Sequence, residues 1–483
     1  MSQYAARNIS MMMDLYEMTM ANGYFKSGVG NNRVVFDAFY RRNPDDGGFA
    51  IFAGLEQIVD YVTNLHFDKN DIDYFASLNI FSDDFLEFLK NYRFRGDVYA
   101  FREGTIMYPY EPVVTVVAPL IDAQLVETAL LAQLNHQSLV ATKAQRIVRA
   151  SKGRGISDFG ARRAHNMDAA VYGARAAYIG GAASTATVLA GQEFGIPVSG
   201  TMAHSWIMYF KDEYEAFKQY ALAYPKNCQF LIDTYDVMRL GLPTAIKVAK
   251  EVLEPMGERL KGVRIDSGDL AYLSKKIRKV LDDAGLNDCK IIASNSLDEY
   301  TITSILDQGG CFDAFGVGER LITCKSDPVF GAVYKLSAVE ENGRFSPRIK
   351  ISEAPEKITN PGRKAVYRIY NESGHAIADL IADLDETIDL SKPFRYVDPL
   401  KPWKVRSFEN CQAKALQQLV VKDGKRVMEI ESLKAIQQYV KDQLSNEIWD
   451  EEQRFENPHR HYIDMTPGYY SAKMDLLHES QDR

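Results

Sequence analysis

The sequence predicts an α/β protein: a barrel of seven strand–helix units, and a second, discontinuous α+β domain formed by the N- and C-terminal parts. Three observations support this prediction. Short apolar runs in the middle of the chain repeatedly end in polar, glycine-containing tips, helix-like segments separate these runs, and the flanking sequence has a different, mixed pattern. The chain has 483 residues, of which 46% are hydrophobic, so two or three domains are expected.

Seven polar tips follow the apolar runs of the middle region, at intervals of about 20–35 residues. The tips are residues 157–163, 178–184, 198–205, 230–236, 263–269, 291–296 and 315–320, and helix-like segments cover 214–223, 241–253 and 270–284. Seven units in series favour a closed barrel over an open sheet. In such a barrel the strands' C-terminal ends share one face, so the tips should converge on one site.

The two flanking regions are expected to pack together. Apolar residues have helical spacing over 11–25, residues 33–40 and 112–120 are strand-like, and 123–136 reads as an amphipathic helix. Beyond the middle region, strand-like segments joined by a Pro/Gly loop lead into a charged helical tail. We therefore assign 1–135 and 336–483 to the second domain, and 136–335 to the barrel that carries the active site.

Composition excludes several classes of protein. The net charge of −8 disfavours nucleic acid and anionic membranes as partners, so a phosphate-bearing ligand needs a local basic site. No apolar run approaches the roughly 18 residues of a membrane span, and Asp14 and Glu17 interrupt the apolar N-terminal stretch, so no secretory signal is expected. The five cysteines stand singly, which predicts reduced thiols in a cytoplasmic protein rather than a zinc site or disulfides.

His204, in the tip 198–205, is the histidine best placed for chemistry. At the C-terminal face of a barrel it could act as a base or as a nucleophile toward phosphorus. Alternatively, it is a satisfied histidine that caps the next segment. His459 and His461 lie in a polar tail, where solvated side chains are expected.

Three arginines at the tips indicate an anionic ligand. Arg162 and Arg163 follow Asp158 and Phe159, and Arg264 stands inside a strand before Asp266. Burying an arginine is costly unless it meets an anion. The alternative is an internal salt bridge, for example between Arg264 and Asp233.

The tips also carry carboxylates, which suit ribose hydroxyls or a Mg²⁺ ion that bridges phosphate oxygens. They are Asp158, Asp233, Asp236, Asp266 and Asp269. Some of them could simply cap helices, and Asp269 is the strongest candidate for a cap.

Glycines at the tips could let backbone N–H groups approach a phosphate. Gly180, Gly181, Gly316 and Gly318 are placed in strand-to-loop turns, and the position after the last strand favours Gly316 and Gly318. No Walker P-loop is present. The residues alone thus predict a barrel enzyme for a phosphorylated sugar, with a candidate phosphohistidine.

Several motifs resemble those of nicotinate phosphoribosyltransferase, a type II phosphoribosyltransferase related to the nicotinamide and quinolinate enzymes. The matching segments run nearly end to end: DLYEMTMANGY, FDAFYRRNP, GTIMYPYEPVVTV, SDFGARRA, GTMAHS, VRIDSGDL, FGVGERLIT, VYKLSAV and EKITNPGRKAVYR. GTMAHS together with RIDSGDL is the most specific pair.

The resemblance implies an irregular seven-stranded α/β barrel with a domain built from both chain ends. It also implies a reaction, in which nicotinate attacks C1 of phosphoribosyl pyrophosphate to give nicotinate mononucleotide and pyrophosphate. ATP hydrolysis, with Mg²⁺, would be coupled through a transient phosphohistidine at His204.

Site residues follow from the same resemblance. Phe159 and Arg162 would sandwich the pyridine ring, Thr201 would lie near nicotinate or the donor, and Arg264 and Asp266 would hold donor phosphate and ribose hydroxyls. The 5-phosphate would bind at Gly316 and Gly318, the donor would also contact Thr359, and Mg²⁺ would bind through substrate phosphates with Asp233 or Asp266. Tyr16 resembles a tyrosine contributed by the partner subunit, which implies a homodimer with a shared site.

One departure and two rival readings accompany the resemblance. Glu319 follows the GVG turn where many members have a small hydroxyl residue, and a carboxylate there must point away from phosphate or pair with Arg320. The rivals are a nicotinamide phosphoribosyltransferase, which Arg162 and Arg163 disfavour, and a non-enzymatic nucleotide-binding regulator.

Overall fold

A computed structural model describes residues 7–388, 394–399 and 401–479. The chain forms two compact units, one made of residues 1–139 and 329–483 and the other of residues 140–328. The sequence predicted boundaries after 135 and after 335, whereas the units divide after 139 and after 328. The helix α6 (Glu127–Ala150) contains the first boundary.

The unit made from both chain ends contains two large sheets. The first has seven strands in the order β13-β12-β1-β5-β3-β19-β20. These strands are Arg344–Pro347, Val333–Glu341, Arg33–Phe39, Val114–Pro119, Asp97–Phe101, Gln417–Lys422 and Lys425–Arg426. All of its described pairings are antiparallel, and β1 pairs with both β5 and β12, so the N-terminal and C-terminal parts share one sheet.

The second sheet has six strands in the order β17-β16-β21-β15-β14-β18. These are Val405–Phe408, Phe394–Val397, Ile463–Met465, Ala376–Asp383, Lys364–Tyr370 and Gln412–Ala415. A short pair, β2 (Ala50–Ile51) and β4 (Ile106–Met107), completes the described strands of this unit.

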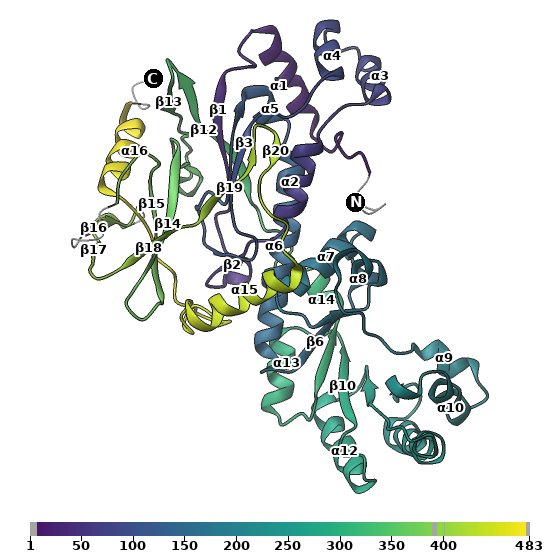
Figure 1. The fold of residues 1–483 in the computed structure, drawn as a ribbon. Helices are drawn as coiled ribbons and strands as arrows, with labels where there is room; N and C mark the ends of the chain where they lie inside the picture. Colours follow the sequence, from purple (N-terminus) through teal and green to yellow (C-terminus); the bar gives the residue numbers. More distant parts are fainter. Residues whose placement is uncertain (1–6, 389–393, 400, 480–483) are drawn as a thin grey trace. The chain divides into compact units, whose positions relative to one another are not determined.

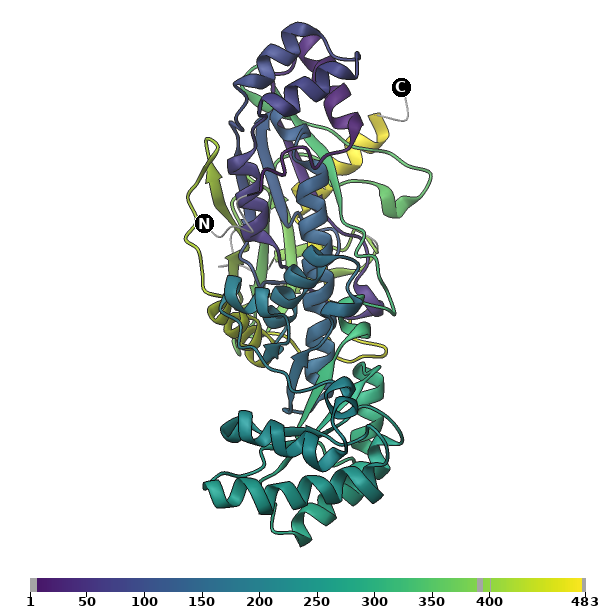
Figure 2. The same ribbon diagram turned by 90° about the vertical axis from the view of Figure 1, so that its right-hand side faces the viewer.

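Helices α1 (Leu15–Lys26), α3 (Lys69–Ser77) and α4 (Asp83–Lys90) cluster in both ribbon views (Figures 1 and 2). Phe25 of α1 packs on Phe85 and Phe88 of α4, with ring centroids 5.6 and 5.3 Å apart. The remaining helices of this unit are α2 (Leu55–Asn64), α5 (Leu120–Gln124), α15 (Leu433–Asn446) and α16 (Pro467–Glu479).

The same unit contains a buried ionic cluster that the sequence did not predict. His461 was expected to be solvated, but its side chain is 1% exposed and lies between Asp379 (3.4 Å) and Glu452 (3.2 Å). Its ring stacks on Tyr108 with centroids 3.9 Å apart, and Arg368 holds the other side of Asp379. Burial of this tail segment requires partners that are distant in the sequence. His459, by contrast, is exposed as expected.

The other unit is a parallel sheet with helices between successive strands. Its strand order is β7-β6-β11-β10-β9-β8, that is Ser184–Thr185, Gly155–Asp158, Ala314–Val317, Lys290–Asn295, Gly262–Ile265 and Gln229–Leu231. The helices are α7 (Met167–Ile179), α8 (Val188–Phe194), α9 (His204–Tyr209), α10 (Glu213–Ala223), α11 (Leu242–Val248), α12 (Leu270–Asp283), α13 (Glu299–Asp307) and α14 (Glu319–Ile322). Figure 1 shows α12 near β10, and α13 packs against α12.

The strand count differs from the predicted seven. Five tips follow strands as expected, but residues 178–184 begin at the end of α7 and lead into β7, so Gly180 and Gly181 terminate a helix rather than a strand. The segment 198–205 adds only one bridge, between Val198 and Thr185, within the described chain. Pro197 lacks an N–H for a longer ladder. The pairings therefore do not confirm closure into a seven-stranded barrel.

Candidate active site

Five of the seven predicted tips meet at one edge of the parallel sheet. Asp158 of β6 is in register with Val317 of β11, and Val317 is in register with Asn295 of β10. β9 pairs with β10 up to Ile265 and Ala293. Because parallel strands present their C-terminal ends at the same edge, Phe159, Asp266 and Gly318 all follow strands at this edge.

His204 is the first residue of α9 and keeps its ring accessible, with the side chain 41% exposed. Its Nε2 lies 3.9 Å from Oδ2 of Asp266, and its Nδ1 lies 3.1 Å from the Thr234 hydroxyl. If Nδ1–H donates to Thr234, Nε2 carries the free lone pair. The histidine can then attack an electrophile from the Asp266 side.

Asp233 organises the turn after β9. Its Oδ2 accepts hydrogen bonds from the Asp266 N–H and the Ser267 hydroxyl, both at 2.7 Å, while Oδ1 is buried without a partner in the described chain. Glu213 is 2% exposed, and neither of its carboxylate oxygens has a described partner. Burial, together with the charge of Asp233, raises the pKa of Glu213 to about 7.

Arg264 points into the same region and does not form the salt bridge considered from the sequence. Its Nη2 donates to the carbonyl oxygen of Met202 at 2.6 Å, while Nε is buried with no hydrogen-bond partner among the described residues. Its guanidinium carbon lies 5.9 Å from the centroid of the Phe159 ring. Burial lowers the pKa of Arg264, and the nearby charge of Arg162 acts in the same direction. An anionic ligand would satisfy this group.

Gly316 and Gly318 allow close approach of Phe159. A Cβ at residue 316 would stand 2.5 Å from two carbons of the Phe159 ring, and a Cβ at residue 318 would stand 3.2 Å from the Phe159 carbonyl oxygen. Of the two alternatives considered for Glu319, the pairing with Arg320 is not observed. Glu319 pairs with Lys325 at 2.8 Å, because Arg320 is engaged by Asp298. Lys325 also lowers the pKa of Glu319.

The remaining tip residues divide into structural and accessible groups. Asp158 is 1% exposed and binds the Gly160 N–H and the Thr185 hydroxyl, so it shapes the tip itself. Asp236 and Asp269 cap the elements that follow them, as predicted for Asp269. Arg162 and Arg163 are exposed in a 3₁₀ turn, and the Thr201 hydroxyl is buried without a described partner.

Tyr16 and Thr359 lie in the unit made from both chain ends. Tyr16 is 43% exposed on α1, where partial burial, followed by the charge of Glu127, raises its pKa. Thr359 is buried, and its hydroxyl accepts a hydrogen bond from the Lys350 N–H at 3.0 Å.

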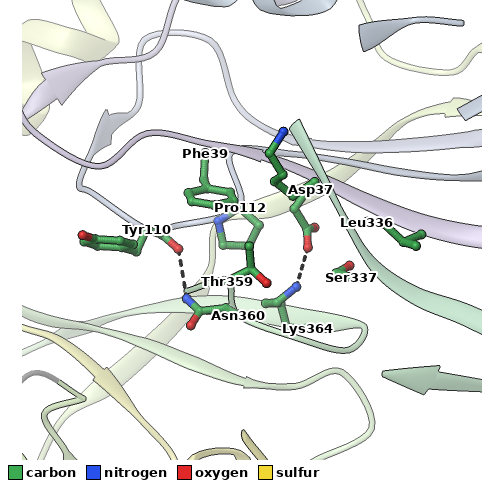
Figure 3. A pocket seen from close by; sticks show the side chains of 10 residues that line it. Asp37, Phe39, Tyr110, Pro112, Leu336, Ser337, Thr359, Asn360 and Lys364 are labelled. Carbon is green, nitrogen blue, oxygen red and sulfur yellow. Dashed lines mark hydrogen bonds and ion pairs between the residues drawn. The ribbon is translucent and has the colours of Figure 1, made fainter. Parts of the chain in front are cut away.

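Thr359 also lines a small pocket beside the ion pair between Asp37 and Lys364 (Figure 3). The pocket's volume is about 10 Å³, close to the space that one water molecule needs. A ligand would therefore reach Thr359 only if this pocket opened.

Two neighbours of the predicted site were missed in the sequence. Thr234 follows the recognised Asp233, but nothing in the local pattern indicates that its hydroxyl meets His204. Glu213 occupies the first turn of α10, where an acidic residue is usually a solvated helix former. The structure nevertheless buries this carboxylate.

Among the described residues, no helix is long and apolar enough to cross a membrane. The same part of the chain contains no group of three or more His, Cys, Asp or Glu side chains arranged to hold a metal ion.

Three family models match the chain and place it among the phosphoribosyltransferases. The N-terminal domain model of nicotinate phosphoribosyltransferase matches residues 11–135, the family model matches 155–371, and the C-terminal domain model matches 363–473. The chain belongs to the nicotinate phosphoribosyltransferase family.

Individual members of this family are also similar to the chain over most of its length. Nicotinate phosphoribosyltransferase of Bacillus subtilis (strain 168) is 45% identical over 479 residues, which are 99% of this chain and 96% of the relative. The human nicotinate phosphoribosyltransferase is 32% identical over 464 residues, 84% of each chain. A crystal structure of human nicotinic acid phosphoribosyltransferase superposes with a TM-score of 0.85 at 29% identity, covering 96% of this chain and 100% of that chain.

Proposed function

We propose that this protein transfers a phosphoribosyl group from phosphoribosyl pyrophosphate to nicotinate, giving nicotinate mononucleotide and pyrophosphate as the first step of NAD synthesis from nicotinate. The observation that carries the proposal is the meeting of His204, Arg264 and Asp266 at the strand ends, in a chain that family models match along most of its length.

The transfer step places distinct demands on these side chains. As the C1–O bond to pyrophosphate breaks, C1 becomes electron-poor and the ring nitrogen of nicotinate forms the new bond to it. Asp266 would orient the ribose hydroxyls, and Arg264 and Arg162 would neutralise negative charge on the substrates. Phe159 and Arg162 would hold the pyridine ring between them.

ATP would be coupled through His204. Nε2 would attack the γ-phosphorus of ATP as the bond to ADP breaks, and water would later hydrolyse the N–P bond to release phosphate. Thr234 supports this role, since a hydroxyl at Nδ1 fixes the ring orientation. The phosphoryl group would add about 1.5 to 2 negative charges next to Asp266, which would change the donor site during the cycle.

Mg²⁺ fits the chemistry of the acidic groups at this site. The unpartnered oxygen of Asp233, or the carboxylate of Asp266, is the kind of hard ligand that this ion prefers, and Mg²⁺ usually completes its shell with substrate phosphates and water. The bound ion would neutralise the leaving pyrophosphate.

The working form would be a homodimer in which Tyr16 enters the partner's site. Leu15, Tyr16 and Met20 of α1 are exposed, and Tyr16 and Met20 stand one helical turn apart. An exposed apolar group of this kind suits contact with a second copy. We also expect the parallel sheet to close as an irregular barrel, with the segment around Val198, which bridges to Thr185, as its seventh strand.

The proposal is tested by identifying products from nicotinate and phosphoribosyl pyrophosphate with Mg²⁺, with and without ATP. Nicotinate mononucleotide that accumulates faster with ATP supports it. Product only from nicotinamide would assign the amide reaction instead. Nucleotide binding without any product would assign a regulator.

A further inference from the structure

The helix α1 is held on the first turn of α6 by a fully buried carboxyl group. Glu17 is 0% exposed, and its Oε1 accepts hydrogen bonds from the Asp14 N–H at 3.1 Å, the Thr128 N–H at 3.2 Å and the Thr128 hydroxyl. Its Oε2 is buried and has no hydrogen-bond partner among the described residues. A buried carboxylate with one bare oxygen is costly when it is ionised, so this group requires an explanation.

Tyr16, the residue before Glu17, meets the residue before Thr128. Partial burial is the main reason that the pKa of Tyr16 is raised, and Glu127 adds to the rise through its charge and through a hydrogen bond with the Tyr16 hydroxyl. Glu127 also accepts a hydrogen bond from Gln124 at 3.0 Å and lies 3.8 Å from the Lys335 ammonium group. Two successive residues of α1 thus contact two successive residues of α6, so the contact made by Glu17 helps to fix where Tyr16 stands.

The surroundings of Glu17 favour its neutral form. Burial raises the pKa of Glu17 to about 7, although the hydrogen bonds from Thr128 and Asp14 lower it, and the charge of Glu127 adds to the rise. An ionised Glu17 would stand beside a second anion on the first turn of α6 and repel it. Because the Tyr16 hydroxyl is bound to that anion, Glu127, the repulsion would disturb the position of Tyr16.

The other elements around α1 contribute tyrosines and one paired acid. Tyr61 of α2 and Tyr334 of β12 face Glu17, and burial raises the pKa of both, with the charge of Glu17 adding to the rise. On α5, Asp122 is engaged by Arg95 at 2.6 Å, and α4 meets α1 through the aromatic rings described above. Protonation of Glu17 is therefore the change at this contact that removes a negative charge near neutral pH.

We propose that Glu17 is a positioning residue for the transfer reaction: its protonated carboxyl group fixes α1 on α6 so that Tyr16 is held ready for the partner's site, and its ionisation releases that position. This inference rests on the proposed function, since it depends on the task of Tyr16 in a shared site. Glu17 acts through Tyr16 and contacts no substrate in this role.

The test measures kcat/KM for nicotinate from about pH 5.5 to 8.5 in the full-length protein. Glu17→Gln keeps the shape of the side chain and cannot ionise. We expect the wild type to lose about ten-fold more activity than Glu17→Gln as the pH rises through 7, since a decline caused by any other group is common to both proteins. Asn22→Ala is the matched control, because it removes a buried polar side chain of the same helix that accepts a hydrogen bond from Ser82 at 3.0 Å. It should keep the wild-type pH profile.

A second measurement does not depend on activity. A carboxyl group whose pKa is raised in the folded state costs stability once the pH exceeds its unfolded value, and the cost is complete above the folded pKa. The midpoint of thermal unfolding should therefore fall for the wild type, relative to Glu17→Gln, between about pH 5 and pH 8.

The outcomes separate the two proposals. Wild-type turnover of nicotinate with the same pH profile in Glu17→Gln would overturn this inference alone, and a change confined to the unfolding midpoint would assign Glu17 a purely structural role. Wild-type protein that gives no product from nicotinate would overturn the proposed function and this inference with it.

Discussion

The ring of Phe159 lies so close to Gly316 that a Cβ at residue 316 would stand 2.5 Å from two of its ring carbons. The two residues come from different strand ends, β6 and β11, and the Phe159 N–H donates to the Val317 carbonyl oxygen at 2.8 Å. The Phe159 ring, which we propose stacks on pyridine, can take this orientation only because Gly316 on the neighbouring strand has no side chain.

Gly316→Ala should therefore displace the ring. A Cβ at that distance cannot be accommodated unless Phe159 moves, so kcat/KM for nicotinate should fall by about 100-fold or more. Gly155→Ala is the control, because its Cβ would meet Ala314 only at 3.9 Å on the same pair of strands. Steady-state kinetics of both variants test this prediction. Equal losses of kcat/KM for nicotinate in Gly316→Ala and Gly155→Ala would refute the role of Phe159.

His204→Asn should separate transfer from ATP use. Without the nucleophilic nitrogen, the rates of product formation with and without ATP should become equal, while transfer without ATP continues. Thr234→Val should weaken ATP stimulation because the ring loses its hydroxyl partner, and Thr234→Ser should retain it. Stimulation that survives in His204→Asn would contradict the phosphohistidine assignment.

Mixing two inactive variants tests the shared site. Tyr16→Ala and Arg264→Ala should each lose activity, since each removes one contribution to every site of the dimer. Subunit exchange would give mixed dimers with one intact site, which restores about a quarter of wild-type activity. Activity no greater than the sum of the separate variants would mean that Tyr16 acts within its own chain or not at all.

The His461 cluster should make stability depend on pH. Burial alone would lower the pKa of His461, but the charges of Asp379 and Glu452 outweigh it and raise the pKa above its ordinary value of 6.5. The protonated ring is bound more tightly in the folded state, so its stabilisation is fully present below about pH 6.5 and is lost as pH rises through the folded pKa.

His461→Gln should therefore cost about 3–5 kcal/mol of unfolding free energy at pH 6, because it removes the charged partner of buried Glu452 and one of the two cations beside Asp379. The difference from wild type should shrink at higher pH. His459→Gln, at an exposed position, should change stability by less than about 0.5 kcal/mol. Denaturant titrations at several pH values measure both, and a difference that grows with pH would contradict the pairing.

The sequence predicts what is local and misses what depends on distant neighbours. Apolar runs that end in polar tips located β6, β8, β9, β10 and β11, and the helical spacing after Asp269 located α12, because these patterns repeat within one element. The burial of Glu213 and His461 could not be read from their polar surroundings. Tyr108 and Asp379, which enclose His461, are remote from it in the sequence, and so is Asp298 from Arg320, which it engages in place of Glu319.

The tip at 178–184 shows a different limit. Its glycines end a helix rather than a strand, and the apolar run before them is α7. Short apolar stretches do not distinguish a buried helix from a buried strand. The convergence of the tips that follow strands, by contrast, could be predicted from the sequence, because parallel strands bring their C-terminal ends to one edge of the sheet.

The most direct test of the central claim is to follow phosphorus-31 resonances in one reaction with nicotinate, phosphoribosyl pyrophosphate, ATP and Mg²⁺, beside a matched reaction with nicotinamide. The account predicts loss of phosphoribosyl pyrophosphate with equal formation of nicotinate mononucleotide and pyrophosphate, release of ADP and phosphate from ATP, and little change with the amide. Consumption of the donor only with nicotinamide, or no consumption with either acceptor, would contradict it.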